Sequence, residues 1–346
     1  MFSLLVFFFT SLIFPFAAAH VAAWHKGMYC LNGTTPGFDD QNANTIANPL
    51  FNLKKDQWWF HAVDKCDQFP PDQGDFLELP ANGEFTVELA VNRAFTTLSY
   101  GGRYLDGQNY TGGLGGLDCI TSPNIHTQNQ SMASGSAFAI SYNSDLSDVT
   151  PENLVVFTTL YHTPWERIAT YAVPNLPACP AGGCICAVTT FSGTILVAHE
   201  PDYFSKWGWV PNGCGEPNIY MQGMSGFRCN VTGQPGDAAL ATAVPPTWCQ
   251  DSPANCTTGA RQMIYWNQAE GNNIEVSAYD ESGSPKSPAY NSVLGFDEGA
   301  QHDIFLTSSG YSGVPNGAQA VRLTLPWSTG LVSLLLIAAL RAGVTF

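Results

Sequence analysis

Alternation of polar and apolar residues predicts a strand most clearly at residues 84–91, where Phe85, Val87 and Leu89 fall on one face. Two apolar runs, residues 137–142 and 154–161, predict further strands, and the short polar stretch between them favours neighbouring places in one sheet. Residues 207–210 and 218–221 predict two more. In the aromatic cluster at residues 57–61, a buried strand is the prediction for Trp58 and Trp59.

Composition agrees with an all-β fold. Among 346 residues there are 33 Gly and 23 Pro, 12% are aromatic and only 12% are charged, a mixture that favours strands and turns over long helices. Residues 100–118 are rich in Gly and Tyr and predict a long loop. We find no internal repeat and no long amphipathic helix. One β-rich domain is therefore expected over residues 20–305.

Both ends of the chain carry processing signals. Residues 1–19 have an apolar run and small residues at Ala17 and Ala19, as in a secretory signal peptide cleaved before His20. Cleavage after Ala23 is a competing interpretation and would leave Trp24 first. Residues 306–330 predict a linker with an anchor attachment region around 316–318 or at 312–313, and the apolar tail at 331–346 completes a glycosylphosphatidylinositol (GPI) signal. The tail is too short for a comfortable membrane span of about 20 residues.

The formal net charge of −15 argues against binding to nucleic acid or to anionic membrane surfaces, which require an excess of Lys and Arg. A neutral polysaccharide remains a possible partner. Contact with a membrane is expected only through the GPI anchor, so the predicted location is extracellular, at the cell surface. The chain is expected to be a monomer.

Ten cysteines fit an oxidising compartment and as many as five disulfides, although spacing does not reveal the partners. Cys179, Cys184 and Cys186 form a cluster that lacks the second cysteine pair or histidine pair of a zinc site, so disulfides are favoured there. Glycosylation sequons mark surface loops and support secretion; they lie at Asn32, Asn109, Asn129, Asn230 and Asn255.

His20 is the main candidate for metal chemistry. At the start of a mature chain its free amine and its imidazole can chelate one metal ion, and a further histidine would complete a set of three nitrogens. Such a set suits Cu(II). The alternative interpretation is that His20 has no metal role, because cleavage of any signal peptide leaves some residue at the N-terminus. On the residues alone His126 would be a surface-loop histidine and Tyr220 a core or rim tyrosine.

Several ordered motifs together resemble the lytic polysaccharide monooxygenases, and most closely auxiliary activity family fourteen, the fungal enzymes associated with xylan on cellulose. The resemblance covers most of the predicted domain. Besides His20, the motifs lie at residues 57–61, 124–127, 179–187, 219–223, 265–267, 270–273 and 297–304.

The resemblance implies an immunoglobulin-like antiparallel β-sandwich with long loops and a copper ion on an exposed face. Carried over by position, His20 supplies an amine and an imidazole, His126 supplies the third nitrogen and Tyr220 the axial oxygen. The implied function is copper-dependent oxidative cleavage of xylan associated with cellulose, with an external electron donor and with oxygen or hydrogen peroxide. The alternative is a GPI-anchored copper-binding protein that serves copper acquisition or wall organisation without cleaving sugar.

The other histidines are expected to pack or to form hydrogen bonds. An odd strand offset from His20 directs His25 to the opposite face. The remaining ones are His61, His162, His199 and His302.

The chain departs from the family pattern in two ways. Residues 188–206 interrupt a junction that is nearly continuous in the family, which is consistent with a retained intron or, if the residues are real, with a surface loop. Cysteines of the pattern are missing at Val91, Ser136 and His162, while Cys30, Cys66 and Cys214 are additional. We expect Cys30 to pair with Cys66, which leaves Cys119 and Cys214 as possible partners.

Overall fold

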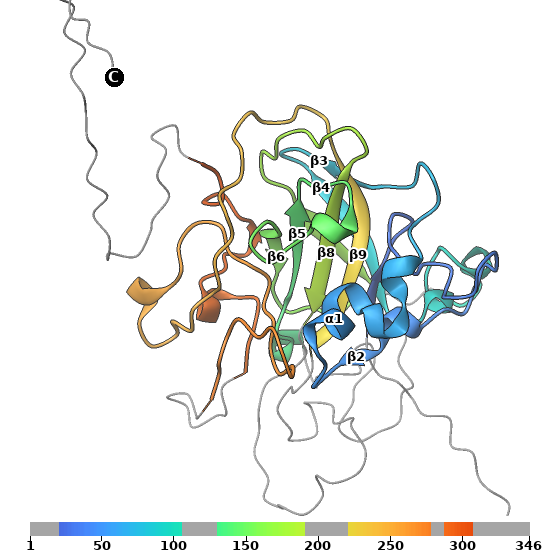
Figure 1. The fold of residues 1–346 in the computed structure, drawn as a ribbon, viewed down its shortest axis with the longest axis horizontal. Coiled ribbons are helices and arrows are strands. Elements are labelled where there is room, and N and C mark those ends of the chain that lie inside the picture. Colours follow the sequence, from blue (N-terminus) through green and yellow to red (C-terminus); the bar gives the residue numbers. More distant parts are fainter. Residues whose placement is uncertain (1–20, 106–129, 191–220, 278–286, 307–346) are drawn as a thin grey trace, which may run out of the picture. The chain divides into compact units, whose positions relative to one another are not determined.

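The computed structural model describes residues 21–105, 130–190, 221–277 and 287–306 (Figure 1), all of which belong to one compact unit. The strands there are β1 (Ala22–Trp24), β2 (Pro49–Leu50), β3 (Leu77–Pro80), β4 (Glu84–Ala90), β5 (Ser136–Ser141), β6 (Val155–Leu160), β7 (Ile168–Ala172), β8 (Cys184–Thr190), β9 (Met221–Thr232) and β10 (Gly299–Ala300).

Helical segments in this part of the chain are short. Among the described residues, the one α-helix is α1, which spans Lys55–Trp58. The 3₁₀ segments are Thr45–Ala47, Trp59–Asp64, Cys66–Gln68, Arg93–Phe95, Tyr100–Gly102, Gln130–Met132, Leu146–Asp148, Pro253–Asn255 and Ser292–Leu294. Across the described ranges, no helix is long and apolar enough to cross a membrane.

The strands form two sheets, which confirms the predicted all-β sandwich. The smaller sheet has the order β1-β4-β7, and the larger one has the order β10-β6-β5-β8-β9-β2, with β3 added beside β9. Neighbouring strands are antiparallel except for β3 and β9, which run parallel. The predicted neighbours at residues 137–142 and 154–161 are β5 and β6, and they do pair.

One hydrophobic core lies between the two sheets. The alternation in β4 buries Phe85, Val87 and Leu89, as predicted. The ring of Phe85 meets that of Phe138 of β5 edge-on, with centroids 4.9 Å apart. Phe138 also lies 5.5 Å from the ring of Phe227 on β9. Aromatic contacts of this kind add to the stability that burial of the rings already supplies.

A second core covers the other face of the large sheet. Ala137 and Ala139 of β5 belong to it, whereas Phe138 belongs to the first core. Tyr265 and Tyr290, from segments without regular structure, pack in the second core. Burial on both faces explains why the middle of β5, residues 137–140, is apolar without interruption while the first half of β4 alternates.

Disulfides join both distant and neighbouring segments in the described part of the chain. Cys30 is bonded to Cys66, as expected from the sequence. The cysteine cluster forms disulfides too: Cys179–Cys184 closes a tight turn, and Cys186 of β8 is joined to Cys229 of β9. A further bridge links Cys249 and Cys256. The other expected partners, Cys119 and Cys214, lie outside the described residues.

The aromatic cluster at residues 57–61 is not a strand, so that prediction is wrong, although Trp58 is buried as expected. The backbone N–H of Lys54 donates to Oε1 of Gln57 at 3.0 Å, which caps α1. Phe60 and His61 then adopt left-handed backbone with φ of 49° and 57°. A β-strand cannot contain such residues, because strands need φ near −120° to −140°.

The start of the 188–206 segment also differs from expectation. Val188 and Thr189 belong to β8 and are buried, so the segment does not begin as a surface loop. Val188 pairs with Phe138 on one side and with Ser225 on the other. The rest of the segment, together with the predicted strand at 207–210 and most of the predicted loop at 100–118, lies outside the described residues.

Candidate metal centre

The predicted copper ligands His20, His126 and Tyr220 all lie outside the described residues. Within the described ranges, no group of three or more His, Cys, Asp and Glu side chains could hold a metal ion. The strands that follow the predicted ligands are described. His20 lies just before β1, Tyr220 directly before β9, and His126 in the segment that leads to β5.

In the large sheet, β5 and β9 begin at the same end. Ser136, the first residue of β5, pairs with Thr190, the last residue of β8. Thr190 in turn pairs with Gln222, near the start of β9. Because β5 and β9 both flank β8 and are antiparallel to it, they run in the same direction from that end (Figure 1).

The small sheet presents the start of β1 at this same end. β3 runs parallel to β9, and Pro80 at its end lies opposite Thr232, the last residue of β9. After a tight turn, in which the N–H of Gly83 donates to the carbonyl of Pro80, β4 runs back toward the end where β9 begins. Its last residue, Ala90, pairs with Ala22 of β1. The starts of β1, β5 and β9 therefore share one end of the sandwich.

The chain directly after His20 is held rigidly. Val21 and Ala23 are buried, and the ring of Trp24 is buried as well. The indole N–H of Trp24 donates to the carbonyl of Ala90 at 2.8 Å, which ties β1 to the end of β4. The chain from Val21 to Trp24 is thus fixed to the fold by burial and by this hydrogen bond.

Buried hydroxyls join β5 to β7 at this end. Thr163 donates its O–H to the carbonyl of Leu160 at 2.6 Å, and the Ser136 hydroxyl lies 2.5 Å from Oγ1 of Thr163. The Tyr171 O–H lies 2.6 Å from Oγ of Ser136, and burial raises the pKa of Tyr171, so it stays protonated. These hydrogen bonds connect the start of β5 to β7 and to the turn that follows β6.

Two histidines near the small sheet and α1 make local contacts. Nδ1 of His25 accepts the backbone N–H of Gly27 at 3.1 Å, and desolvation by burial, followed by the charge of Lys26, lowers the pKa of His25 to about 4. His61 is fully buried, and its Nδ1 lies 3.2 Å from Oδ2 of Asp64. These contacts bear out the expectation of packing and hydrogen bonding for both.

The three remaining histidines are His162, His302 and His199. The imidazole ring of His162 lies 6.3 Å from the ring of Tyr161, with the planes nearly perpendicular. His302 is exposed, and His199 lies outside the described residues.

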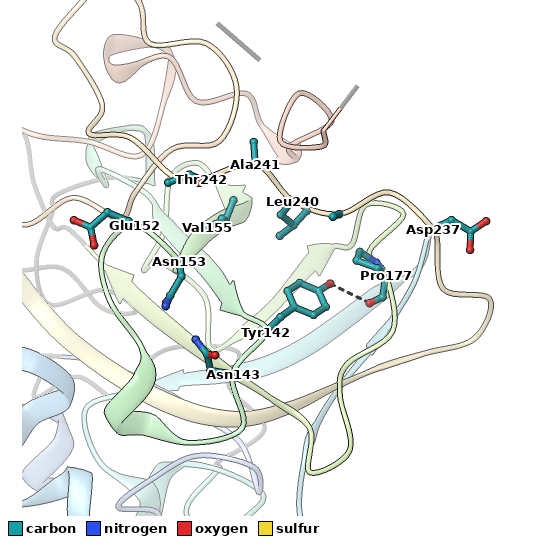
Figure 2. Close-up of a pocket in the computed structure, with 11 residues that line it drawn as sticks. Tyr142, Asn143, Glu152, Asn153, Val155, Pro177, Asp237, Leu240, Ala241 and Thr242 are labelled. Carbon is teal, nitrogen blue, oxygen red and sulfur yellow. Dashed lines mark hydrogen bonds between the residues drawn. The ribbon is translucent and has the colours of Figure 1, made fainter. Parts of the chain in front are cut away.

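A groove of about 570 Å³ lies at the other end of β5 (Figure 2). Tyr142, which directly follows β5, forms part of its wall and donates its O–H to the carbonyl of Pro177 at 3.0 Å. Glu152 and Asp237 also line it. Because β5 separates this groove from the strand starts described above, the groove is not part of the candidate metal centre.

Comparison of the sequence with known proteins identifies a family that is consistent with the β-sandwich fold. The sequence profile of the lytic polysaccharide monooxygenase family AA14 matches residues 2–335. The chain is 35% identical over 305 residues to AA14 family lytic polysaccharide monooxygenase A of Trametes coccinea (strain BRFM310), and the match covers 84% of this chain and 62% of that protein.

Two further relatives are AA14 family lytic polysaccharide monooxygenases B. The one from Pycnoporus cinnabarinus is 34% identical over 319 residues, which cover 87% of this chain and 74% of the relative. The one from Talaromyces rugulosus is 33% identical over 318 residues, which cover 86% of this chain and 97% of the relative. With the family profile over nearly its whole length and a β-sandwich fold, the chain belongs to the AA14 family of lytic polysaccharide monooxygenases.

Proposed function

We propose that this chain is a secreted copper-dependent monooxygenase that oxidatively cleaves xylan associated with cellulose. Membership in a family that is generally copper-dependent supports the proposal. The structural observation that carries it is the shared position of the starts of β1, β5 and β9. His20 and Tyr220 lie next to the starts of β1 and β9 in the sequence, and His126 lies in the segment that leads to β5.

The donor set fits copper. In the proposed site the free amine and imidazole of His20 and the imidazole of His126 provide three nitrogens, which suit Cu(II) in a tetragonal arrangement. Tyr220 would add a phenol oxygen to this donor set. When bound, copper supplies the redox chemistry by which oxygen or hydrogen peroxide oxidises a C–H bond of the polysaccharide, with electrons from an external donor.

The chain's own part is to hold these groups and keep one side open to the polysaccharide. Anchoring of β1 by the Trp24 indole fixes the point from which His20 extends. The site also depends on processing, because cleavage between Ala19 and His20 creates the free amine. Cleavage after Ala23 would remove His20 altogether, and the chain would lose two of its three nitrogen ligands.

The test begins with the secreted protein. N-terminal sequencing should find His20 first, and metal analysis should find one copper per chain. With copper, a reductant and xylan-coated cellulose, the protein should release oxidised oligosaccharides, and a His126→Ala variant should not. Protein that holds copper through His20 and still releases no oxidised sugar would contradict the cleavage proposal and support a copper-binding surface protein.

We propose further that the protein is attached outside the cell by a GPI anchor, supported by the small residues and apolar tail of residues 306–346. A phosphatidylinositol-specific phospholipase should then release it from intact cells into the medium. If the protein remains with the cells after this treatment while a known anchored protein is released, the anchor proposal is wrong.

A further inference from the structure

A shallow hollow of about 490 Å³ lies beside α1, and its lining is Lys54, Lys55, Asp56, Trp59 and Glu270. The hollow lies near the end of the sandwich at which β1, β5 and β9 begin. Leu50 of β2 pairs with Met221, the first residue of β9, and α1 begins at Lys55. Five residues span at most about 18 Å, so the hollow lies within that reach of the start of β9.

The wall of the hollow is rigid. The indole N–H of Trp58 donates to the carbonyl of Glu270 at 2.8 Å, and the Trp58 ring lies 5.1 Å from that of Tyr265. Trp59 is half-buried, and its ring lies 5.7 Å from Tyr265 and 5.3 Å from Phe60. Trp59 is thus held before any ligand arrives, which lowers the entropy cost of binding.

The segment that carries Glu270 is fastened to the chain before α1. The N–H of Ala269 donates to the carbonyl of Leu53 at 2.9 Å, and Nε2 of Gln268 donates to the carbonyl of Leu50 at 2.6 Å. These hydrogen bonds fasten both sides of the hollow to the chain around β2, and β2 pairs with the start of β9.

Two lysine ammonium groups in the hollow have no carboxylate partner in the described part of the chain. The acidic chain has 28 Asp and Glu against 13 Lys and Arg. Even so, among the described residues neither Lys54 nor Lys55 lies within 4.0 Å of a carboxylate, whereas Arg93, Arg167 and Arg261 all form ion pairs. Nζ of Lys55 lies over the ring of Trp59, 5.3 Å from its centroid.

The charged and aromatic side chains that line the hollow match an acidic sugar. A sugar that carries a carboxylate offers an anion for Lys54 and Lys55, hydroxyl donors for Asp56 and Glu270, and an apolar ring face for Trp59. A neutral sugar would leave both ammonium groups without an anion, and a ligand with many anionic groups would be repelled by Asp56 and Glu270.

We infer that this hollow is a subsite for uronic acid substituents of the polysaccharide, so that acidic xylan is preferred over unsubstituted xylan. The inference rests on the proposed function, because it assigns the hollow to the same substrate. It adds a specificity-determining role for Lys54 and Lys55 and a packing role for Trp59.

Binding tests this without any cleavage. The full-length secreted protein, freed of metal and kept without reductant, is titrated calorimetrically with xylotetraose bearing one glucuronosyl group and with plain xylotetraose. Exposed ion pairs contribute about 0.2–1 kcal/mol each, so the acidic sugar should bind about fivefold more tightly. The double variant Lys54→Gln, Lys55→Gln should lose this preference, while Trp59→Leu should weaken binding of both sugars.

Lys26→Gln is the matched control, since it removes the same charge from an exposed lysine outside the hollow, 3.9 Å from Asp75. It should keep the preference. Salt should abolish the preference in the wild type, because the Debye length falls from about 30 Å at 0.01 M to about 3 Å at 1 M. Equal binding of the two sugars, no binding of the acidic sugar, or a preference that survives in the double variant would overturn the inference.

The two proposals can fail separately. If the wild type prefers the acidic sugar but releases no oxidised product with copper and reductant, the subsite stands and the cleavage proposal fails. If it cleaves xylan-coated cellulose but binds both sugars equally, the cleavage proposal stands and the subsite is wrong.

Discussion

His25 should make the stability of the protein depend on pH. Burial lowers its pKa to about 4 in the folded chain, below the value of 6.5 for a free histidine. Between these two values the unfolded chain binds a proton that the folded chain does not. The stability is therefore full above about pH 6.5 and falls as the pH drops toward 4, by roughly 3 kcal/mol at most.

Urea unfolding at pH 7, 5.5 and 4.5 measures this loss. Asn at position 25 can still accept the N–H of Gly27 but cannot titrate, so His25→Asn should show a flatter dependence on pH. His302→Asn, at an exposed position, should follow the wild type. Parallel curves for wild type and His25→Asn would show that another group is responsible.

The hydroxyls of Ser136, Thr163 and Tyr171 should behave as a coupled set. Thr163 donates to Leu160, so the Ser136 O–H is directed to Thr163 and the Tyr171 O–H to Ser136. Tyr171→Phe removes one donor and should cost about 1 kcal/mol. Ser136→Ala removes the hydroxyl that lies 2.6 Å from the buried Tyr171 O–H and should cost about 2 kcal/mol.

A double-mutant cycle by urea unfolding tests the coupling. The double variant Ser136→Ala, Tyr171→Phe should lose less stability than the two single variants together, because no donor remains unsatisfied. Tyr104→Phe serves as the control, since that side chain is 44% exposed. Strictly additive losses would mean that Ser136 and Tyr171 do not share a hydrogen bond.

At the scale of elements, the packing of α1 depends on Gly271. Its φ is +84°, and a Cβ built there would lie 2.7 Å from Cζ2 of Trp58. Gly271→Ala should therefore cost about 1 kcal/mol for the backbone and about 1–3 kcal/mol for overpacking. Gly74 has a φ of +92° with nothing within 4 Å of a built Cβ. Gly74→Ala should show the backbone cost alone, and equal losses in urea unfolding would refute the packing argument.

Local pattern predicted some elements and missed others for a physical reason. β4 was predictable because its first half alternates exposed Glu84 and Thr86 with buried Phe85 and Val87. β5 and β6 were predictable because apolar runs bounded by polar residues are typical of central strands. The aromatic cluster has the same apolar content but forms α1 and a 3₁₀ turn. Two features produce this local structure: the hydrogen bond from Lys54 to Gln57 that caps α1, and the left-handed backbone of Phe60 and His61. Of the two, only the cap could be predicted from residue types.

At the scale of the whole molecule, residue types indicated His20 and the family resemblance added His126 and Tyr220, but neither could place the three together. His20 and Tyr220 are far apart in sequence, and strand pairing over such separations is not a local property. The register supplies what was missing: Ala22 lies opposite Ala90, and Thr190 lies opposite Gln222. The position of the predicted ligands themselves stays a prediction.

Copper should stabilise the whole sandwich if the proposed site is correct, because β1 belongs to one sheet and β5 and β9 to the other. A ligand that binds only the folded chain adds about 4 kcal/mol when its free concentration is 1,000 times Kd. Calorimetry should therefore show a higher Tm with copper in protein that begins at His20. One extra alanine before His20 blocks the amine but keeps every side chain, and it should remove most of this increase, as should His126→Ala. A similar increase in Tm for the extended chain would place the copper elsewhere.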